Sequence, residues 1–316
     1  MVDTPPGDDH VGFRISSLYA LGMVSISFAV FVASLFYLFN AENIRYYSLS
    51  VPVYLFIMIL SVTLGNVPVL ILTEIMVILY FGLFTVLFFK STTQKKRLID
   101  SPAGYFAVVT PAIFLLSIVS VLIEQAFGVS LGGTPLEKLL RTNPYILYNS
   151  LIYAPFVEEF GFRILPLGIF VFLMIYMKTG NLRDSTLSFF APGFYRERYG
   201  LKLNRWDLIL VIITSAIWAY AHVYFGVWDL GKILPVAITG IALGFAYLKF
   251  GPYLDILMHW LMNGPSGLFE VYRASFPLLI PFYLIMFVTG IAGIILLIRY
   301  SYRGHTVNVR SPIDRI

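Results

Sequence analysis

YILYNSLIYAPFVEEFGFRILPLGIFVFLMIYM, residues 145–177, is an apolar run that contains two adjacent glutamates and an arginine. A membrane-spanning helix needs about 20 apolar residues to cross roughly 30 Å of hydrocarbon. This run exceeds that length at about 1.5 Å per residue, and it contains Gly161 and Pro166, so we expect a single bent span. Charged groups at membrane depth are costly unless they face a partner or a wet cavity, so the cluster indicates a functional site.

The composition of the whole chain indicates a polytopic membrane protein. Of 316 residues, 59% are hydrophobic and only 12% are charged, and the mean hydropathy is +0.83. Cysteine is absent, which excludes a thiol nucleophile, a disulfide and a Cys-ligated metal. Residues 1–17 carry Asp3, Asp8 and Asp9 and make a poor secretory leader, so we expect the first span to be an uncleaved anchor.

The apolar runs predict an all-α transmembrane bundle of about nine helices, because helices satisfy their own backbone groups in lipid. We divide the chain into N-terminal membrane helices without a motif (1–144), a candidate catalytic core (145–265), and a last helix with a cytoplasmic tail (266–316). The predicted spans are 18–39, 47–64, 69–89, 104–124, 145–177, 207–225, 233–249, 253–270 and 277–298.

The distribution of basic residues predicts the topology. With 145–177 as one crossing, one side of the membrane carries 16 Lys and Arg and the other carries 5. The positive-inside rule then places the N-terminus outside and the C-terminus in the cytoplasm of a multi-pass cell-membrane protein. The basic loop 178–206 would face the anionic headgroups of the cytoplasmic surface, although an ordinary positive-inside loop explains it as well.

The acidic cluster has a defined helical geometry. Glu159 and Arg163 are four residues apart and share a face, whereas Glu158 projects about 100° away. One carboxylate is therefore paired and the other is free. A free Glu in an apolar setting suits general acid or base work. A buried Glu–Arg bridge between helices would explain Glu159 and Arg163 alone, but not Glu158.

Two of the four histidines lie in apolar segments. Trp218 precedes His222 by four residues and can lie against its ring, and His259 precedes Asn263 by four. An imidazole N–H and an amide N–H could there converge on one oxygen, which is the arrangement that an oxyanion hole requires. Either histidine alone could equally be a hydrogen-bonded interhelical residue.

Glu158-Glu159-x-x-x-Arg163, then an aromatic residue and His222, then His259-x-x-x-Asn263 together resemble the CAAX prenyl protease and bacteriocin-processing family. This is the ABI or type II CAAX endopeptidase group of intramembrane proteases. The resemblance covers roughly residues 145–265 and includes the glycine-rich run 240–247. Trp218 stands where the family usually has Phe, and Ile164 stands where Gly often follows the Arg.

The resemblance implies hydrolysis of a peptide bond within the membrane, with no cofactor. Glu158 and His222 would activate a water molecule, and His259 with Asn263 would stabilise the oxyanion. Glu159 and Arg163 would hold Glu158 in place. The partners would be the lipid bilayer and a peptide or protein substrate, with a C-terminal prenylated Cys-a-a-X tail as one option, and no nucleic acid.

Two further protease mechanisms stay open from the sequence. Glu158, His222 and His259 could ligate zinc as a two-His-one-Glu site. Gly264-Pro265-Ser266-Gly267 weakly matches a serine-protease string, although an ordinary helix terminus also looks like this.

Outside the enzymes, the runner-up is a transporter or a catalytically silent membrane scaffold. Glu74, Glu124 and Asp255 could then line an ion path. Of these, Glu124 and Asp255 fall near predicted span ends, where snorkelling to the interface explains them.

Overall fold

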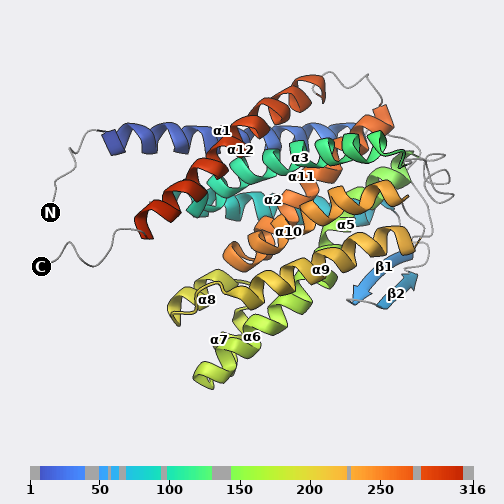
Figure 1. The fold of residues 1–316 in the computed structure, drawn as a ribbon. Helices are drawn as coiled ribbons and strands as arrows, with labels where there is room; N and C mark the ends of the chain where they lie inside the picture. Colours follow the sequence, from blue (N-terminus) through green and yellow to red (C-terminus); the bar gives the residue numbers. More distant parts are fainter. Residues whose placement is uncertain are drawn as a thin grey trace, which may run out of the picture.

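A computed structural model describes residues 8–39, 50–55, 58–63, 69–93, 98–129, 144–225, 229–272 and 279–308. This part of the chain is a helical bundle with one β-hairpin, which confirms the predicted all-α membrane class (Figure 1). The elements are α1 (Asp8–Phe39), β1 (Ser50–Leu55), β2 (Met58–Thr63), α2 (Val69–Thr93), η1 (Leu98–Asp100), α3 (Pro102–Ala126), α5 (Pro144–Glu159), η2 (Phe160–Ile164), α6 (Leu165–Thr179), α7 (Leu182–Leu187), α8 (Pro192–Arg198), α9 (Arg205–Tyr224), η3 (Leu230–Lys232), α10 (Ile233–Phe250), α11 (Pro252–Tyr272) and α12 (Leu279–Asn308).

The bundle packs around α3, which contacts α1, α10 and α12. Glycines let α12 approach α3 closely: a methyl group at Gly290 would lie 2.6 Å from the Pro111 carbonyl oxygen, and one at Gly293 would lie 2.5 Å from that of Val108. Such small-residue contacts are typical of helix pairs in membranes. One buried apolar cluster runs through α1, α2, α3, α5, α9, α10, α11 and α12, and a second one joins α6 to α9 and α10.

Helices occur where the sequence predicts membrane spans, with one exception. Among the described residues, five stretches are long and apolar enough to cross a membrane: Pro102–Ala126, Ser150–Thr179, Arg205–Tyr224, Leu230–Phe250 and Ile280–Tyr300.

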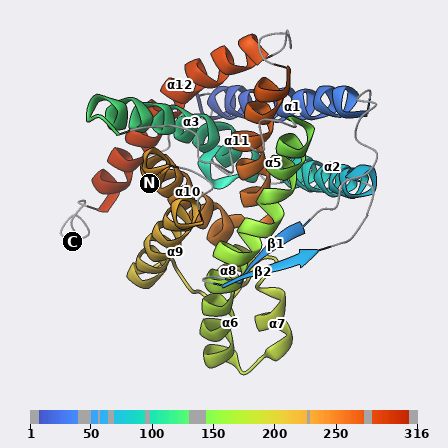
Figure 2. The ribbon, with the colours of Figure 1, turned by 90° about the vertical axis from the view of Figure 1, so that its right-hand side faces the viewer.

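The exception is the predicted span 47–64, which is wrong as a helix. Residues 50–55 and 58–63 form the two antiparallel strands of a hairpin, in which Ser50 pairs with Thr63 and Leu55 with Met58. Pro52 cannot donate an intrahelical hydrogen bond, and the β-branched Val51, Val53 and Val62 favour strands. β1 lies against α5 and η2, so the hairpin borders the segment that carries the acidic cluster (Figure 2).

The hairpin changes the topology. Eight helical passes remain among the described residues, counting α5 to α6 as one. The start of α1 and the end of α12 lie at the same end of the bundle (Figure 1). This differs from the prediction that the termini lie on opposite sides. In the count of Lys and Arg, Arg14 moves to the basic side of the membrane and Arg45 moves to the other side. The asymmetry therefore stays at 16 to 5.

The long segment α5–α6 is one continuous helix, as expected for a single crossing, but a π-helical turn interrupts it. This turn, η2, spans Phe160–Ile164, directly after Glu159 and around Arg163. π-Helical turns inside α-helices occur frequently at functional sites. Pro166 directly follows this turn, and because the helix is continuous there, its missing N–H removes one backbone hydrogen bond beside η2.

The segment 178–206 forms a folded cap over the start of α11. Arg196 makes a buried bidentate pair with Asp207 at 2.8 and 2.7 Å, which joins α8 to α9. Arg196 is buried and thus unavailable to lipid headgroups, whereas Arg198 in the same segment is exposed. The turn between α10 and α11 is buried beneath the cap. Gly251 there has φ +100°, and a methyl group on it would lie 2.5 Å from the Phe190 carbonyl oxygen.

Candidate active site

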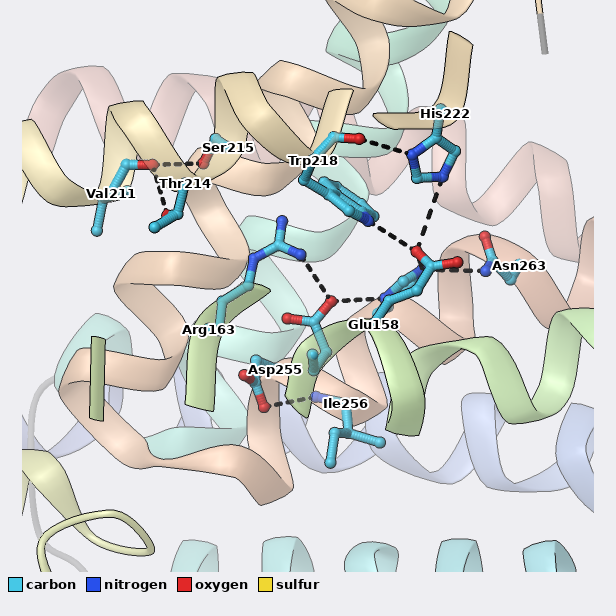
Figure 3. A network of polar contacts seen from close by, with 12 residues as sticks. Glu158, Arg163, Val211, Thr214, Ser215, Trp218, His222, Asp255, Ile256 and Asn263 are labelled. Atoms are coloured by element: carbon cyan, nitrogen blue, oxygen red, sulfur yellow. Dashed lines mark hydrogen bonds and ion pairs between the residues drawn. The ribbon is translucent and has the colours of Figure 1, made fainter. Parts of the chain in front are cut away.

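Glu158 lies at the centre of the polar cluster, near the end of α5 (Figure 3). Its Oε2 accepts a hydrogen bond from Nε1 of Trp218 at 2.7 Å. The same oxygen lies 3.7 Å from Nε2 of His222 and 3.9 Å from Nε2 of His259. The three reactive side chains that the sequence predicts therefore converge, from α5, α9 and α11.

His222 lies near the C-terminal end of α9, where one of its ring nitrogens is engaged. Its Nδ1 is 2.8 Å from the Trp218 carbonyl oxygen, so Nδ1 carries a hydrogen, and in the neutral imidazole Nε2 presents a lone pair toward Glu158. The Trp218 ring meets the His222 ring edge-on at 5.1 Å, which confirms the predicted contact. These two contacts fix the orientation of the imidazole.

His259 and Asn263 share a face of α11, as their spacing predicts. Nδ2 of Asn263 is 3.0 Å from Nε2 of His259, so the two groups hydrogen-bond each other. The other ring nitrogen, Nδ1, lies 2.7 Å from Oε1 of Glu159 and donates to that carboxylate. Glu159 thus orients His259, whereas we expected from the sequence that it holds Glu158.

The Glu159–Arg163 pair is present and completely buried, with Nη1 of Arg163 3.2 Å from Oε1 of Glu159. The guanidinium also lies on the Trp218 ring, its Cζ 3.9 Å from the ring centroid. Gly240 makes room for it, because a methyl group there would lie 2.9 Å from Nη2 of Arg163. The glycine-rich run on α10 therefore has a packing role at the site.

Asp255 is a buried member of the cluster that the sequence motifs do not include. Its side chain is inaccessible and interacts electrostatically with Glu159 and Arg163. Snorkelling to the interface is wrong as an explanation, because the start of α11 lies beneath the 178–206 cap. Its Oδ1 accepts from the Ile256 backbone N–H at 2.7 Å, while Oδ2 has no partner in the described part of the chain (Figure 3).

The site does not have the donor arrangement of a zinc centre. Within the described residues, no group of three or more His, Asp or Glu side chains is positioned to hold a metal ion. The amide of Asn263 already occupies Nε2 of His259, an atom that a metal at this site would need. Zinc would have to displace this hydrogen bond.

The residues that would support a serine protease or an ion path lie on α2, α3 and α11. Gly264-Pro265-Ser266-Gly267 lies inside α11 and is not a helix terminus, and the side chain of Ser266 lies outside what the structure describes. Glu74 is exposed on α2, and Glu124 lies in the last turn of α3. Asp255 is the member of the hypothetical ion path that lies at the site.

A comparison with protein families finds a match for the central part of the chain. Residues 140–264 match the family described as type II CAAX prenyl endopeptidase Rce1-like. The predicted family resemblance is confirmed. All the residues of the polar cluster fall within the matched region, and the matched family is a family of proteases. No curated protein and no solved structure matches the chain.

Proposed function

We propose that this protein is a glutamate-dependent intramembrane endopeptidase that cleaves a peptide bond near a membrane-embedded substrate. The observation that carries the proposal is the 3.7 Å separation of Glu158 Oε2 and His222 Nε2. Both atoms are acceptors, because His222 gives its hydrogen to the Trp218 carbonyl group. A water molecule has two hydrogens and suits such a pair.

In the proposed reaction, Glu158 takes a proton from this water while His222 holds the second hydrogen. The hydroxyl oxygen then attacks the carbonyl carbon of the scissile peptide bond. Glu158 can return the proton to the leaving amine, as a general base becomes a general acid in the second half of the reaction. These steps use the residues of the chain and one water molecule, with no metal.

Asn263 and His259 would stabilise the oxyanion that forms on the carbonyl oxygen. Asn263 has a second amide hydrogen beyond the one that faces His259. The Nδ1 hydrogen of His259 is donated to Glu159. For His259 to donate to the oxyanion as well, its Nε2 must also carry a hydrogen. The amide of Asn263 would then leave the ring nitrogen, and both residues would direct N–H groups at the oxyanion.

The substrate is a peptide or protein, and the family match supports a C-terminal prenylated Cys-a-a-X tail. The basic side of the bundle, with both chain ends, would face the cytoplasm of a cell-membrane protein. A prenylated tail anchored in the inner leaflet would reach the site from there.

The test is cleavage of matched prenylated and unprenylated peptides by the purified protein, with and without a chelator. We expect cleavage that resists chelation and is lost in Glu158→Gln, which keeps the size and hydrogen bonding of the side chain but removes the base. Glu74→Gln is the matched control, because Glu74 is an exposed carboxylate on α2.

Loss of activity on chelation would favour zinc, and wild-type activity in Glu158→Gln with loss in Ser266→Ala would favour a serine protease. An intact protein that cleaves no peptide would favour a transporter or scaffold.

A further inference from the structure

Trp218 contacts four side chains of the polar cluster. Its indole N–H donates to Glu158, its ring meets the rings of His222 and His259 at 5.1 and 5.3 Å, and Arg163 lies on its face. The side chain is buried, with 3% of its surface exposed. One residue on α9 therefore connects groups from α5, η2 and α11 (Figure 3).

Of these contacts, the one to Glu158 is chemically specific. A phenylalanine could form the ring contacts, but only an indole among the apolar aromatic side chains offers an N–H donor. The 2.7 Å distance from Nε1 to Oε2 is that of a strong hydrogen bond to a carboxylate. Arg163 does not engage Glu158 directly, because its Nη1 hydrogen bond goes to Glu159.

We propose that Trp218 is the positioning residue for the catalytic glutamate: its indole N–H fixes the Glu158 carboxylate at the distance from His222 that one water molecule bridges. This inference rests on the proposed function. A carboxylate at the end of a flexible Glu side chain has several rotamers, and a hydrogen bond from a buried, ring-packed donor selects one of them. Glu159 and Arg163 do not perform this task, because they act on His259.

The experiment has one arm that does not depend on activity. The chain has four tryptophans, so a protein with isotope-labelled indole nitrogens gives a simple NMR spectrum in detergent micelles. Trp218→Phe identifies the Trp218 signal by its loss. In Glu158→Gln we expect this signal to move, because a neutral amide replaces the charged acceptor. In Glu74→Gln it should stay.

The second arm measures peptide cleavage by Trp218→Phe. We expect kcat to fall about tenfold or more, since a hydrogen bond to a charged group contributes a factor of that size. KM should stay close to wild type, and the melting temperature should fall no further than in the control. Trp260→Phe is the matched control, because it makes the same truncation at a buried tryptophan whose ring packs against Phe31, Tyr80 and Phe84.

The outcomes separate the inference from the proposed function. A Trp218 signal that does not respond to Glu158→Gln overturns the inference, whatever the activity. A signal that moves, with wild-type kcat in Trp218→Phe, overturns the positioning role and leaves the proposed function standing. A signal that moves in a protein that cleaves no peptide supports the hydrogen bond and overturns the proposed hydrolysis.

Discussion

Glu159 on α5 and His259 on α11 are joined by a 2.7 Å hydrogen bond between Oε1 and Nδ1, although 100 residues separate them in sequence. The same oxygen of Glu159 contacts Arg163, and the far side of the His259 ring contacts Asn263. A buried line of polar groups thus runs from Arg163 to Asn263. Glu158 instead accepts its hydrogen bond from Trp218, so the two adjacent glutamates have different hydrogen-bond partners.

The first prediction concerns this line. Glu159→Gln should lower kcat/KM by about 10²–10⁴, because a carboxylate that holds a catalytic histidine in one tautomer has an effect of this order. The double variant Glu159→Gln with His259→Ala should be no slower than His259→Ala alone, since the two residues act as a unit. Steady-state kinetics on the peptide panel check this. If the two substitutions lowered kcat/KM by factors that multiply in the double variant, Glu159 would not act through His259.

The second prediction concerns the buried ion pair. Arg163→Ala leaves Glu159 as an uncompensated buried charge, which should lower the free energy of unfolding by about 3–5 kcal/mol as well as abolish activity. Equilibrium unfolding in detergent measures the free energy of unfolding. Arg198→Ala is the control, because Arg198 pairs with Asp184 at 3.2 Å while 54% of its side chain is exposed. Its loss should cost less than about 1 kcal/mol. Equal effects in the two variants would contradict the prediction.

The third prediction concerns the glycine beside Arg163. In Gly240→Ala the new methyl group would lie 2.9 Å from Arg163 Nη2 and 2.9 Å from the Ser215 Cβ. We expect a loss of about 1–3 kcal/mol of stability, as for other overpacked positions, and a loss of activity from displacement of the guanidinium. Gly82→Ala is the matched control, since its methyl group would enter open space. Wild-type behaviour of both variants would refute the close packing.

The fourth prediction concerns the oxyanion. Asn263→Ala should reduce kcat by about 10²–10³ with little change in KM, because the interaction strengthens only in the transition state. Single-turnover kinetics separate the chemical step from binding. A variant with raised KM and normal kcat would assign Asn263 to substrate binding instead.

The fifth prediction concerns topology. Reporter fusions at the N-terminus and after Arg303 should report the same side of the membrane, because the start of α1 and the end of α12 lie at one end of the bundle (Figure 1). We expect the cytoplasmic side, from the distribution of Lys and Arg. Signals from opposite sides would mean that residues 47–64 cross the membrane.

The sequence predicts the residue types of the site and their convergence, but not which pairs they form. Spacing along one helix is local, so Glu159–Arg163, Trp218–His222 and His259–Asn263 all contact each other as expected. The hydrogen bonds of Trp218 to Glu158 and of Glu159 to His259 depend on how α5, α9 and α11 pack. Neither has a signal in a single sequence.

Depth in the membrane is also poorly predicted by counting residues. Such a count puts His259 near the surface and His222 more than half way across, because it assumes that every helix starts at the interface. The turn at Gly251 is instead buried against the Phe190 carbonyl group, so α11 starts inside the protein. This brings His259 to the level of His222 and buries Asp255. The hairpin at 50–63 escapes prediction because an apolar run alone does not distinguish strand from helix.

The π-helical turn has a consequence for deletions within the α5–α6 helix. A π-helical turn holds one residue more than an α-helical turn, so deletion of one residue within Phe160–Ile164 would restore a regular helix without rotating α5 against α6. The bundle would keep its packing, while a deletion between Glu159 and Arg163 would shorten their spacing from four residues to three. A deletion in the middle of a membrane helix would here spare the fold and change the geometry of the site.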